Sequence, residues 1–410
     1  MRLTRPVSAA PAMLGIIALL LAACAPAAPS PTPAPAKPAA PAASPAASPA
    51  ASPAAAASPA AAASPAAGPS PAASPSPAAG AVQVPVAPPI AKPACPPRKL
   101  VFGNAVTPPN MVHLPAYIAK ELGYFDEVGL DVDIKSFEGG VGGLRAALAG
   151  GVDVAGTSSD PLFAVAAAGG PARAIGTYAP KLSVVMTSAP DIKTVQDMKG
   201  RKAGIQEVGG FNYVMTLLLL ASAGLTKDDV QFVTVSTAGR VPALVNGQID
   251  TSPLHADQYY AALAQKPDLV TLAKMWEVAP DWWYSCFAVT EDKIKNNRQD
   301  LVDFMTAVLK AQRFMYANRE QTIQLGMKLT GDKPRDVIEK AYDDLARGGI
   351  WSVNDGMPEK MINYTLDKQI ELGMVQAGQR PSLDKIIDRS IVDEAIKRVG
   401  GPMTGDPRWY

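Results

Sequence analysis

From residue 99 onward the chain alternates short apolar runs with helix-length segments, and this alternation limits the folds it can adopt. The run "KLVFGNAV" (99–106) indicates a buried strand, "LPAYIAKEL" (114–122) a helix and "LDVDIKSF" (130–137) the next strand. Strands separated by helices of about ten residues are typical of parallel sheets covered by helices. The sequence therefore predicts an α/β fold.

The alternation restarts near residue 183, which indicates a second lobe. The segment "SVVMTSA" (183–189) begins a new series of strands and helices, and "WWYSCFAVTEDKI" (282–294) indicates a strand that leads back. The part of the chain after residue 92 is also longer than a domain with a single hydrophobic core usually is.

The two series predict specific lobe boundaries. We expect lobe 1 to comprise residues 98–186 and 287–410 and lobe 2 to comprise residues 187–286, with hinge crossings near 184–189 and 284–290. One α/β lobe interrupted by another resembles a type II periplasmic binding protein. In such sheets ligands bind beyond the carboxyl ends of the strands, in the crevice between the lobes.

The N-terminal region predicts that the protein is located outside the cytoplasm. Residues 1–23 combine a basic start with the apolar run "MLGIIALLLAA" (13–23), which is too short to span a bilayer but suits a signal peptide. The following "LAAC" resembles a bacterial lipobox, so we expect lipidation at Cys24; the alternative is a free cysteine beside an ordinary cleavage site. Residues 24–92 are rich in Ala, Pro and Ser and predict a disordered, semi-stiff linker.

Charge and cysteine content exclude several classes. Four of the 38 basic residues lie in the first 92, leaving 34 against 37 acidic residues in the body, and no basic patch indicates nucleic acid binding. The sequence has two histidines and no metal-ligand spacing, so we expect no metal and no cofactor. Cys95 and Cys286 remain after lipidation; a disulfide and a buried, inert Cys286 both stay open.

Three motifs carry a resemblance to a known family. They are "PNMVHLPAYIAKELGYFDEVGLDVDI", "GGLRAALAGGVDVAGTSSDPLFAVAAAGGPARAIG" and "IKTVQDMKGRKAGIQ". Together, over roughly residues 98 to 320, they resemble the ABC-transporter solute-binding proteins for nitrate, taurine, aliphatic sulfonates and thiamine pyrimidine precursors. Pro109, Asn110 and His113 are similar to the motif of the pyrimidine-precursor branch. The Cys-rich motif of the related pyrimidine synthase is absent.

The candidate ligand-binding residues of lobe 1 follow its strands. Asn110 and His113 lie in the loop after the first strand, where they could contact ligand or begin a helix. Gly139 and Gly140 open a helix and could expose N–H groups to an anion or to a planar ligand edge, or simply form a turn. The other candidates are Ser158, Ser159 and Asp160, of which Asp160 could instead cap its helix.

Lobe 2 supplies a second set of candidates. Glu207 would repel an anion, whereas Phe211 could stack on a ring, and this weakens the sulfonate and nitrate alternatives. An aromatic cluster lies next to the return crossing; its adjacent tryptophans would point in opposite directions on a strand, so at most one of them meets ligand. The full set comprises Glu207, Gly209, Gly210, Phe211, Asn212, His255, Asp257, Trp276, Trp283 and Tyr284.

These patterns and the resemblance imply a non-enzymatic receptor. We expect a lipid-anchored monomer on the outer face of the cytoplasmic membrane that closes on a small molecule. Its partners would be that ligand and an ABC permease with its ATPase. A pyrimidine-like or vitamin-like heterocycle is favoured, with sulfonate, taurine or nitrate binding and a synthase-like enzyme as alternatives.

Overall fold

A computed structural model describes residues 96–409, and the side chains of 96–408. The expected signal peptide, Cys24 and the linker lie outside these residues, as does Cys95. Cys286 is buried and free. Within the described part, no helix is both long and apolar enough to cross a bilayer.

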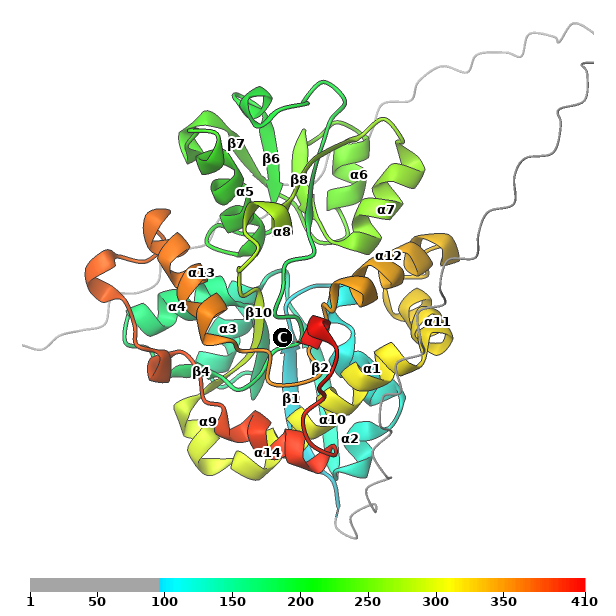
Figure 1. Cartoon of the computed structure of the whole chain (residues 1–410), viewed down its shortest axis with the longest axis vertical. Coiled ribbons are helices and arrows are strands. Elements are labelled where there is room, and N and C mark those ends of the chain that lie inside the picture. Colours follow the sequence, from blue (N-terminus) through cyan, green and yellow to red (C-terminus); the bar gives the residue numbers. More distant parts are fainter. Residues whose placement is uncertain (1–95, 410) are drawn as a thin grey trace, which may run out of the picture. The chain divides into compact units, whose positions relative to one another are not determined.

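Two five-stranded sheets organise the chain (Figure 1). The first has the order β2-β1-β3-β10-β4 and the second β7-β6-β8-β5-β9. The strands of the first are β1 (Arg98–Asn104), β2 (Leu130–Ser136), β3 (Val154–Ser158), β4 (Ala172–Ala174) and β10 (Ser285–Thr290). Those of the second are β5 (Val185–Ser188), β6 (Lys202–Ile205), β7 (Gln231–Thr234), β8 (Thr251–Leu254) and β9 (Val270–Lys274). The predicted α/β, two-lobed architecture is confirmed.

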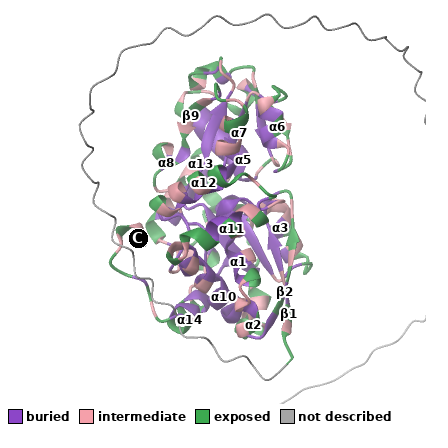
Figure 2. Cartoon of the chain, turned by 90° about the vertical axis from the view of Figure 1, so that its right-hand side faces the viewer, coloured by how far each residue is buried: buried purple, intermediate pink, exposed green. Residues whose placement is uncertain are grey.

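Helices cover both sheets, as the alternating pattern predicts. Lobe 2 carries α5 (Phe211–Ser222), α6 (Arg240–Val245), α7 (Ala256–Gln265) and α8 (Met275–Val278). Lobe 1 begins with α1 (Pro115–Glu121), α2 (Tyr124–Glu127), α3 (Gly140–Leu148) and α4 (Ser159–Ala167). After β10 it continues with α9 (Glu291–Asn296), α10 (Arg298–Ala317), α11 (Arg319–Leu329), α12 (Arg335–Gly348), α13 (Glu359–Glu371) and α14 (Ser390–Arg398). In Figure 2 the strands and the inner helix faces are buried, whereas exposed residues lie on the outer helices and loops.

Each sheet contains one strand that runs against its neighbours. β10 is antiparallel to β3 and β4, and β5 is antiparallel to β8 and β9. Both strands directly follow a hinge crossing, so each enters its sheet from the side of the other lobe. The sheets are therefore mixed, whereas the sequence pattern predicted parallel ones.

The crossings also come earlier than expected. Val185 and Met186, assigned to lobe 1, pair with β8 and β9 in the second sheet. Ser285 and Cys286, assigned to lobe 2, pair with β3 in the first sheet. The apolar runs that mark the crossings extend into the strands that follow them, and the sequence pattern does not separate the two. The connecting segments are residues 175–184 and 279–284.

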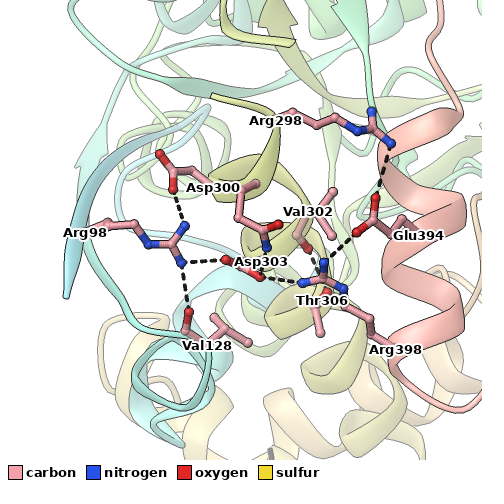
Figure 3. A network of polar contacts seen from close by, with 10 residues as sticks. Arg98, Val128, Arg298, Asp300, Val302, Asp303, Thr306, Glu394 and Arg398 are labelled. Carbon is pink, nitrogen blue, oxygen red and sulfur yellow. Dashed lines mark hydrogen bonds and ion pairs between the residues drawn. The ribbon is translucent and has the colours of Figure 1, made fainter. Parts of the chain in front are cut away.

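A polar network fastens the base of lobe 1 (Figure 3). The Asp303 side chain on α10 is only 7% exposed and accepts hydrogen bonds from Arg98 Nη2 at 2.5 Å and from Arg398 Nη1 at 2.7 Å. Arg98 opens β1, and Arg398 ends α14. One carboxylate thus ties together the first strand and two helices that lie about 200 and 300 residues further along the chain.

Replacing this carboxylate should destabilise the fold. We expect Asp303→Ala to lower the free energy of unfolding by about 1.5–3 kcal/mol, because hydrogen bonds to charged groups are lost while both guanidinium groups stay partly hydrated. Urea unfolding measures the change. The exposed Asp336→Ala is the control and should change stability by less than about 0.5 kcal/mol. Equal effects would show that Asp303 does not fasten the lobe.

Candidate functional site

The candidate site lies between the lobes, where the carboxyl ends of β1 and β3 face those of β6 and β8. The loops after these strands enclose a cavity of about 20 Å³, which is about the space of one water molecule. Its lining includes His113, Gly140, Ser158 and Tyr178 from lobe 1 and the first crossing, Gln206, Glu207, Phe211 and His255 from lobe 2, and Tyr284 from the second crossing. The two lobes are closed on one another.

His113 lines this cavity, and the Asn110 side chain contacts it. Asn110 Oδ1 lies 2.6 Å from His113 Nδ1, which makes Nδ1 the ring's donor and leaves Nε2 as its acceptor. Nε2 lies 3.3 Å from the hydroxyls of both Tyr178 and Tyr284. Asn110 precedes a short 3₁₀ turn, Met111–His113, but makes no capping hydrogen bond with its side chain. Asn110 therefore orients the cavity residue His113 and does not cap the turn.

Five aromatic rings meet around the cavity, and we call them the ring cluster: His113, Tyr178, Phe211, His255 and Tyr284. The ring centroids of Phe211 and Tyr284 lie 4.3 Å apart, and the ring of Phe211 stacks on that of His255 at 6.0 Å and 19°. The two imidazoles meet edge to face at 5.5 Å. All five rings are buried, and they come from both lobes and both crossings.

Burial keeps the two imidazoles neutral. It lowers the pKa of His113 to about 3, with a smaller contribution from the charge of Arg240. It also lowers the pKa of His255, where the charges of His113, Arg240 and Lys333 act in the same direction. Burial raises the pKa of the Tyr178 and Tyr284 hydroxyls. The ring cluster therefore presents neutral donors and acceptors at physiological pH.

The loop that contains Gly139 and Gly140 binds a carboxylate of the protein itself, the Glu207 side chain of lobe 2. Glu207 Oε1 accepts a hydrogen bond of 2.9 Å from Val141 N, in the first turn of α3. Gly139 precedes this helix at φ +153°, and a Cβ atom built on it would lie 1.9 Å from Glu207 Oε1. A residue without a side chain is thus needed for the carboxylate to reach the helix N-terminus.

Further contacts across the lobes accompany this one. Glu138 Oε2 of lobe 1 accepts from Thr237 N of lobe 2 at 3.1 Å. Asp257 on α7 accepts from Met111 N at 3.3 Å and pairs with Lys333 Nζ at 2.5 Å. Each lobe thus places carboxylates against the other lobe's backbone N–H groups. We call these contacts, with the Glu207–Val141 bond, the interlobe latch.

Several sequence candidates are brought together here. His113, Gly140, Ser158, Phe211, His255 and Tyr284 line the cavity, and the Asn110 side chain contacts His113. Gly139, Gly210, Glu207 and Asp257 take part in or adjoin the interlobe latch. Asp257 makes no helix cap, because His255 holds the cap position of α7.

Three candidates serve as internal supports instead. Asn212 Nδ2 donates to Pro253 O at 3.0 Å, and Ser159 Oγ donates to Trp283 O at 2.6 Å. The Trp283 ring is fully buried against Phe163, and its Nε1 donates to Gly356 O. These side chains point into the lobes because the crossing and the helix starts turn them away from the crevice.

Asp160 and Gly209 lie at a different cavity, of about 360 Å³, lined by residues of α3 and α4 together with Val208 and Met374. The cap position of α4 belongs to Ser158, whereas Asp160 Oδ1 accepts from Gln369 Nε2 at 2.8 Å. Burial raises the pKa of this carboxyl to about 7. Neither residue lines the cavity of the ring cluster.

Trp276 does not line the cavity of the ring cluster. It lies on α8 and is 37% exposed, at a separate cavity of about 680 Å³ that is lined by α7 and β9 of lobe 2, by α12 of lobe 1 and by both crossings. The sequence placed it with the ligand because it precedes the second crossing by only a few residues.

The structure adds residues that sequence reasoning missed. Tyr178 belongs to the first crossing, and Gln206 directly follows β6. Arg240, the first residue of α6, is fully buried, and its charge acts on His113, His255 and Tyr284. A basic residue at a helix start after a strand was the available signal for Arg240. Within residues 96–409, no cluster of three or more His, Cys, Asp or Glu side chains could hold a metal ion.

Removing the latch carboxylate should open the lobes. We expect Glu207→Ala to shift the closed-to-open ratio of the ligand-free protein by about tenfold, because one charge-assisted hydrogen bond at a helix N-terminus contributes about 1–2 kcal/mol. Small-angle scattering should show a larger radius of gyration. The radius of gyration of Glu207→Gln, which retains an acceptor, should lie between those of the wild type and Glu207→Ala. Glu277→Ala changes an exposed residue and should have the wild-type radius. An unchanged radius in Glu207→Ala would contradict the latch.

The buried imidazoles should make the protein sensitive to acid. Between pH about 6.5 and 3 the unfolded chain binds protons that the folded His113 does not, so its contribution to stability is complete above pH 6.5 and decreases as pH falls. Each histidine adds a slope of at most about 1.4 kcal/mol per pH unit. Denaturant unfolding of His113→Gln from pH 4 to 7 should show a smaller slope than the wild type. Parallel curves would mean that His113 titrates normally.

Comparison with known proteins supports the fold and identifies the family. A binding protein of Brucella abortus is 27% identical over 212 residues, which is 52% of this chain and 66%, just under two thirds, of that relative. A thiamine biosynthesis protein of Haemophilus influenzae is 31% identical over 143 residues, 34% of this chain and 45% of that relative.

A solved structure shares the whole two-lobed body. The periplasmic aliphatic sulphonate-binding protein SsuA of Escherichia coli aligns with a TM-score of 0.56 at 22% identity, over 72% of this chain and 99% of SsuA. At this identity the likeness establishes the fold, which is that of a periplasmic binding protein. The NMT1/THI5-like family matches residues 110–322, more than half of the 410 residues. The chain therefore belongs to the NMT1/THI5-like family.

Proposed function

We propose that this protein is the lipid-anchored solute-binding component of an ABC importer and that it captures a flat, neutral-ringed heterocycle between its lobes. The observation that carries the proposal is the ring cluster. Five buried rings from both lobes and both crossings converge on the cavity at the strand ends. Such rings stack on planar ligands, each pair contributing about 0.5–1.5 kcal/mol beyond burial.

Polar atoms around the rings favour a heterocycle over a plain aromatic ring. His255 Nδ1 and Asn110 Nδ2 are buried and have no hydrogen-bond partner among the described residues. His255 lines the cavity, and Asn110 contacts the cavity residue His113. Buried polar groups are normally paired, so these unpaired atoms suit a ligand with ring nitrogens or exocyclic donors. A pyrimidine or a similar vitamin-like ring has this character.

Ligand capture requires the lobes to open, because the closed cavity of about 20 Å³ is smaller than any heterocycle. Opening breaks the interlobe latch and exposes the ring cluster. Ligand bound between the lobes then replaces part of the latch and favours a second, ligand-filled closed form. Closure around ligand is the hinge motion by which a permease can distinguish a loaded receptor from an empty one.

The N-terminal sequence supports the proposed cellular placement. Lipidation at Cys24 would tether the protein outside the cytoplasmic membrane, and the Ala/Pro/Ser segment to residue 92 would give the lobes reach to a permease. The same fold binds aliphatic sulphonate in the Escherichia coli protein, so sulfonate, taurine or nitrate is the second candidate ligand class.

A ligand screen tests the proposal. Thiamine pyrimidine precursors, riboflavin, taurine, alkanesulfonates and nitrate would be compared by thermal shift and then by calorimetry. We expect a heterocycle to stabilise the protein and Phe211→Leu to weaken its binding about 2- to 10-fold, because one ring contact is lost. Asn110→Ala combined with His113→Ala should weaken it further.

The control is Phe232→Leu, which changes a half-buried phenylalanine on β7 and should leave affinity unchanged. Stabilisation only by sulfonates or nitrate would contradict the heterocycle. A Schiff base formed with pyridoxal phosphate in the crevice would favour the synthase-like alternative over a receptor.

A further inference from the structure

Arg240 is a buried cation with an unused binding edge. It is 0% exposed, and its Nη1 donates to Pro253 O at 3.2 Å. Its Nε and Nη2 are buried and have no hydrogen-bond partner among the described residues. A guanidinium group removed from water without a compensating anion is strongly unfavourable, so this arrangement indicates a missing partner.

The two free nitrogens form one edge of the guanidinium plane. The Nε–H and Nη2–H groups point in the same direction and match the two oxygens of a carboxylate. Arg319 uses this same pair of atoms, donating from Nε and Nη2 to the two oxygens of Asp343 at 2.9 and 2.8 Å. The contact of Arg240 Nη1 with Pro253 fixes the plane and leaves the carboxylate-binding edge available.

The neighbouring acids are already engaged elsewhere. The charges of Asp257 and Glu138 act on Arg240 from nearby. Asp257, however, accepts from Lys333 and Met111, and Glu138 accepts from Thr237 N. Since Glu138 belongs to lobe 1 and Arg240 to lobe 2, opening the lobes removes the charge of Glu138 from the surroundings of Arg240, whereas Asp257 stays with Arg240 in lobe 2.

The position of Arg240 connects it to the ring cluster. Its charge acts on His113 and His255, both of which line the cavity, and on Tyr284 between them. A planar ligand held by the rings would therefore lie within the field of this cation. The rings are neutral, and Glu207, the charged residue of the cavity lining, is held by Val141 N. Arg240 is therefore the cation near the rings that can attract an anionic group.

We propose that Arg240 anchors a carboxylate on the ligand, so that the receptor takes a planar heterocycle bearing one carboxyl group. This inference rests on the proposed function, since it assigns the ligand class of the same site. A singly charged, planar carboxylate fits the two-pronged edge and is compensated by the guanidinium, whereas a second negative charge would have no cation to pair with and would be repelled by Glu138, Asp257 and Glu207.

Matched probe pairs separate the ring from the carboxylate. Calorimetry on the full chain would compare orotate with uracil and nicotinate with nicotinamide. We expect the wild type to bind the carboxylate member of a pair roughly 10- to 100-fold more tightly, because hydrogen bonds between charged groups form at the Arg240 edge. Arg240→Met should abolish this preference while the neutral member still binds.

Two further variants keep the test decisive. Arg240→Lys retains the charge without the two-pronged edge, so its preference for the carboxylate member should fall between those of the wild type and Arg240→Met. Arg240→Lys also takes the place of Arg240→Met in the test if the latter does not fold. Arg201→Met changes an exposed arginine of the same lobe and should behave as the wild type.

Each outcome has one meaning. Equal binding of both members of a pair by the wild type, or a preference that stays at the wild-type level in Arg240→Met or Arg240→Lys, overturns the assignment of Arg240 but leaves a heterocycle receptor intact. Failure of every ring, charged or neutral, to bind the wild type contradicts the proposed function and this inference with it.

Discussion

The hydrogen bond between the Glu207 carboxylate and the N-terminus of α3 governs the arrangement of the two lobes. It places a side chain of lobe 2 against the backbone of lobe 1, at the point where the strand ends of both sheets meet. Gly139 is required for this approach, since any side chain there would collide with the carboxylate. The ring cluster and Glu207 line the same cavity, which has space for about one water molecule. Ligand capture must compete with this internal anion.

Electrostatics divides the site into two functional parts. The ring cluster is neutral because burial suppresses protonation of both histidines, and it can recognise a ring by stacking and by directed hydrogen bonds. The carboxylates of the interlobe latch are held by backbone N–H groups or by Lys333, so they act between the lobes. Arg240 remains as the buried charge with an unused edge. The heterocycle and the carboxylate therefore follow from separate features of one crevice.

The sequence predicted the fold and the part of the site that lies in loops after strands. The alternation of strands and helices, restarted near residue 183, is a local property, and so is the placement of Asn110, His113 and His255 at strand ends. The direction of a side chain in a crossing depends on tertiary packing. For this reason Trp283, which appeared equivalent to Tyr284 in the sequence, lies inside lobe 1. Arg240 has no motif, and only the structure reveals that it is buried with its Nε and Nη2 atoms unpaired. The glycine loop was expected to meet an anion or a ligand edge, but that the anion would be Glu207 depends on how the lobes close.

The central claim is that ligand binds among the five rings between the lobes. A crystal structure of the protein grown with the compound that stabilises it most tests this directly. Our account predicts a planar density in contact with Phe211 and His113, with Glu207 withdrawn from Val141 N. Density in the large cavity beside Trp276, with Glu207 still bound to α3, would contradict the account.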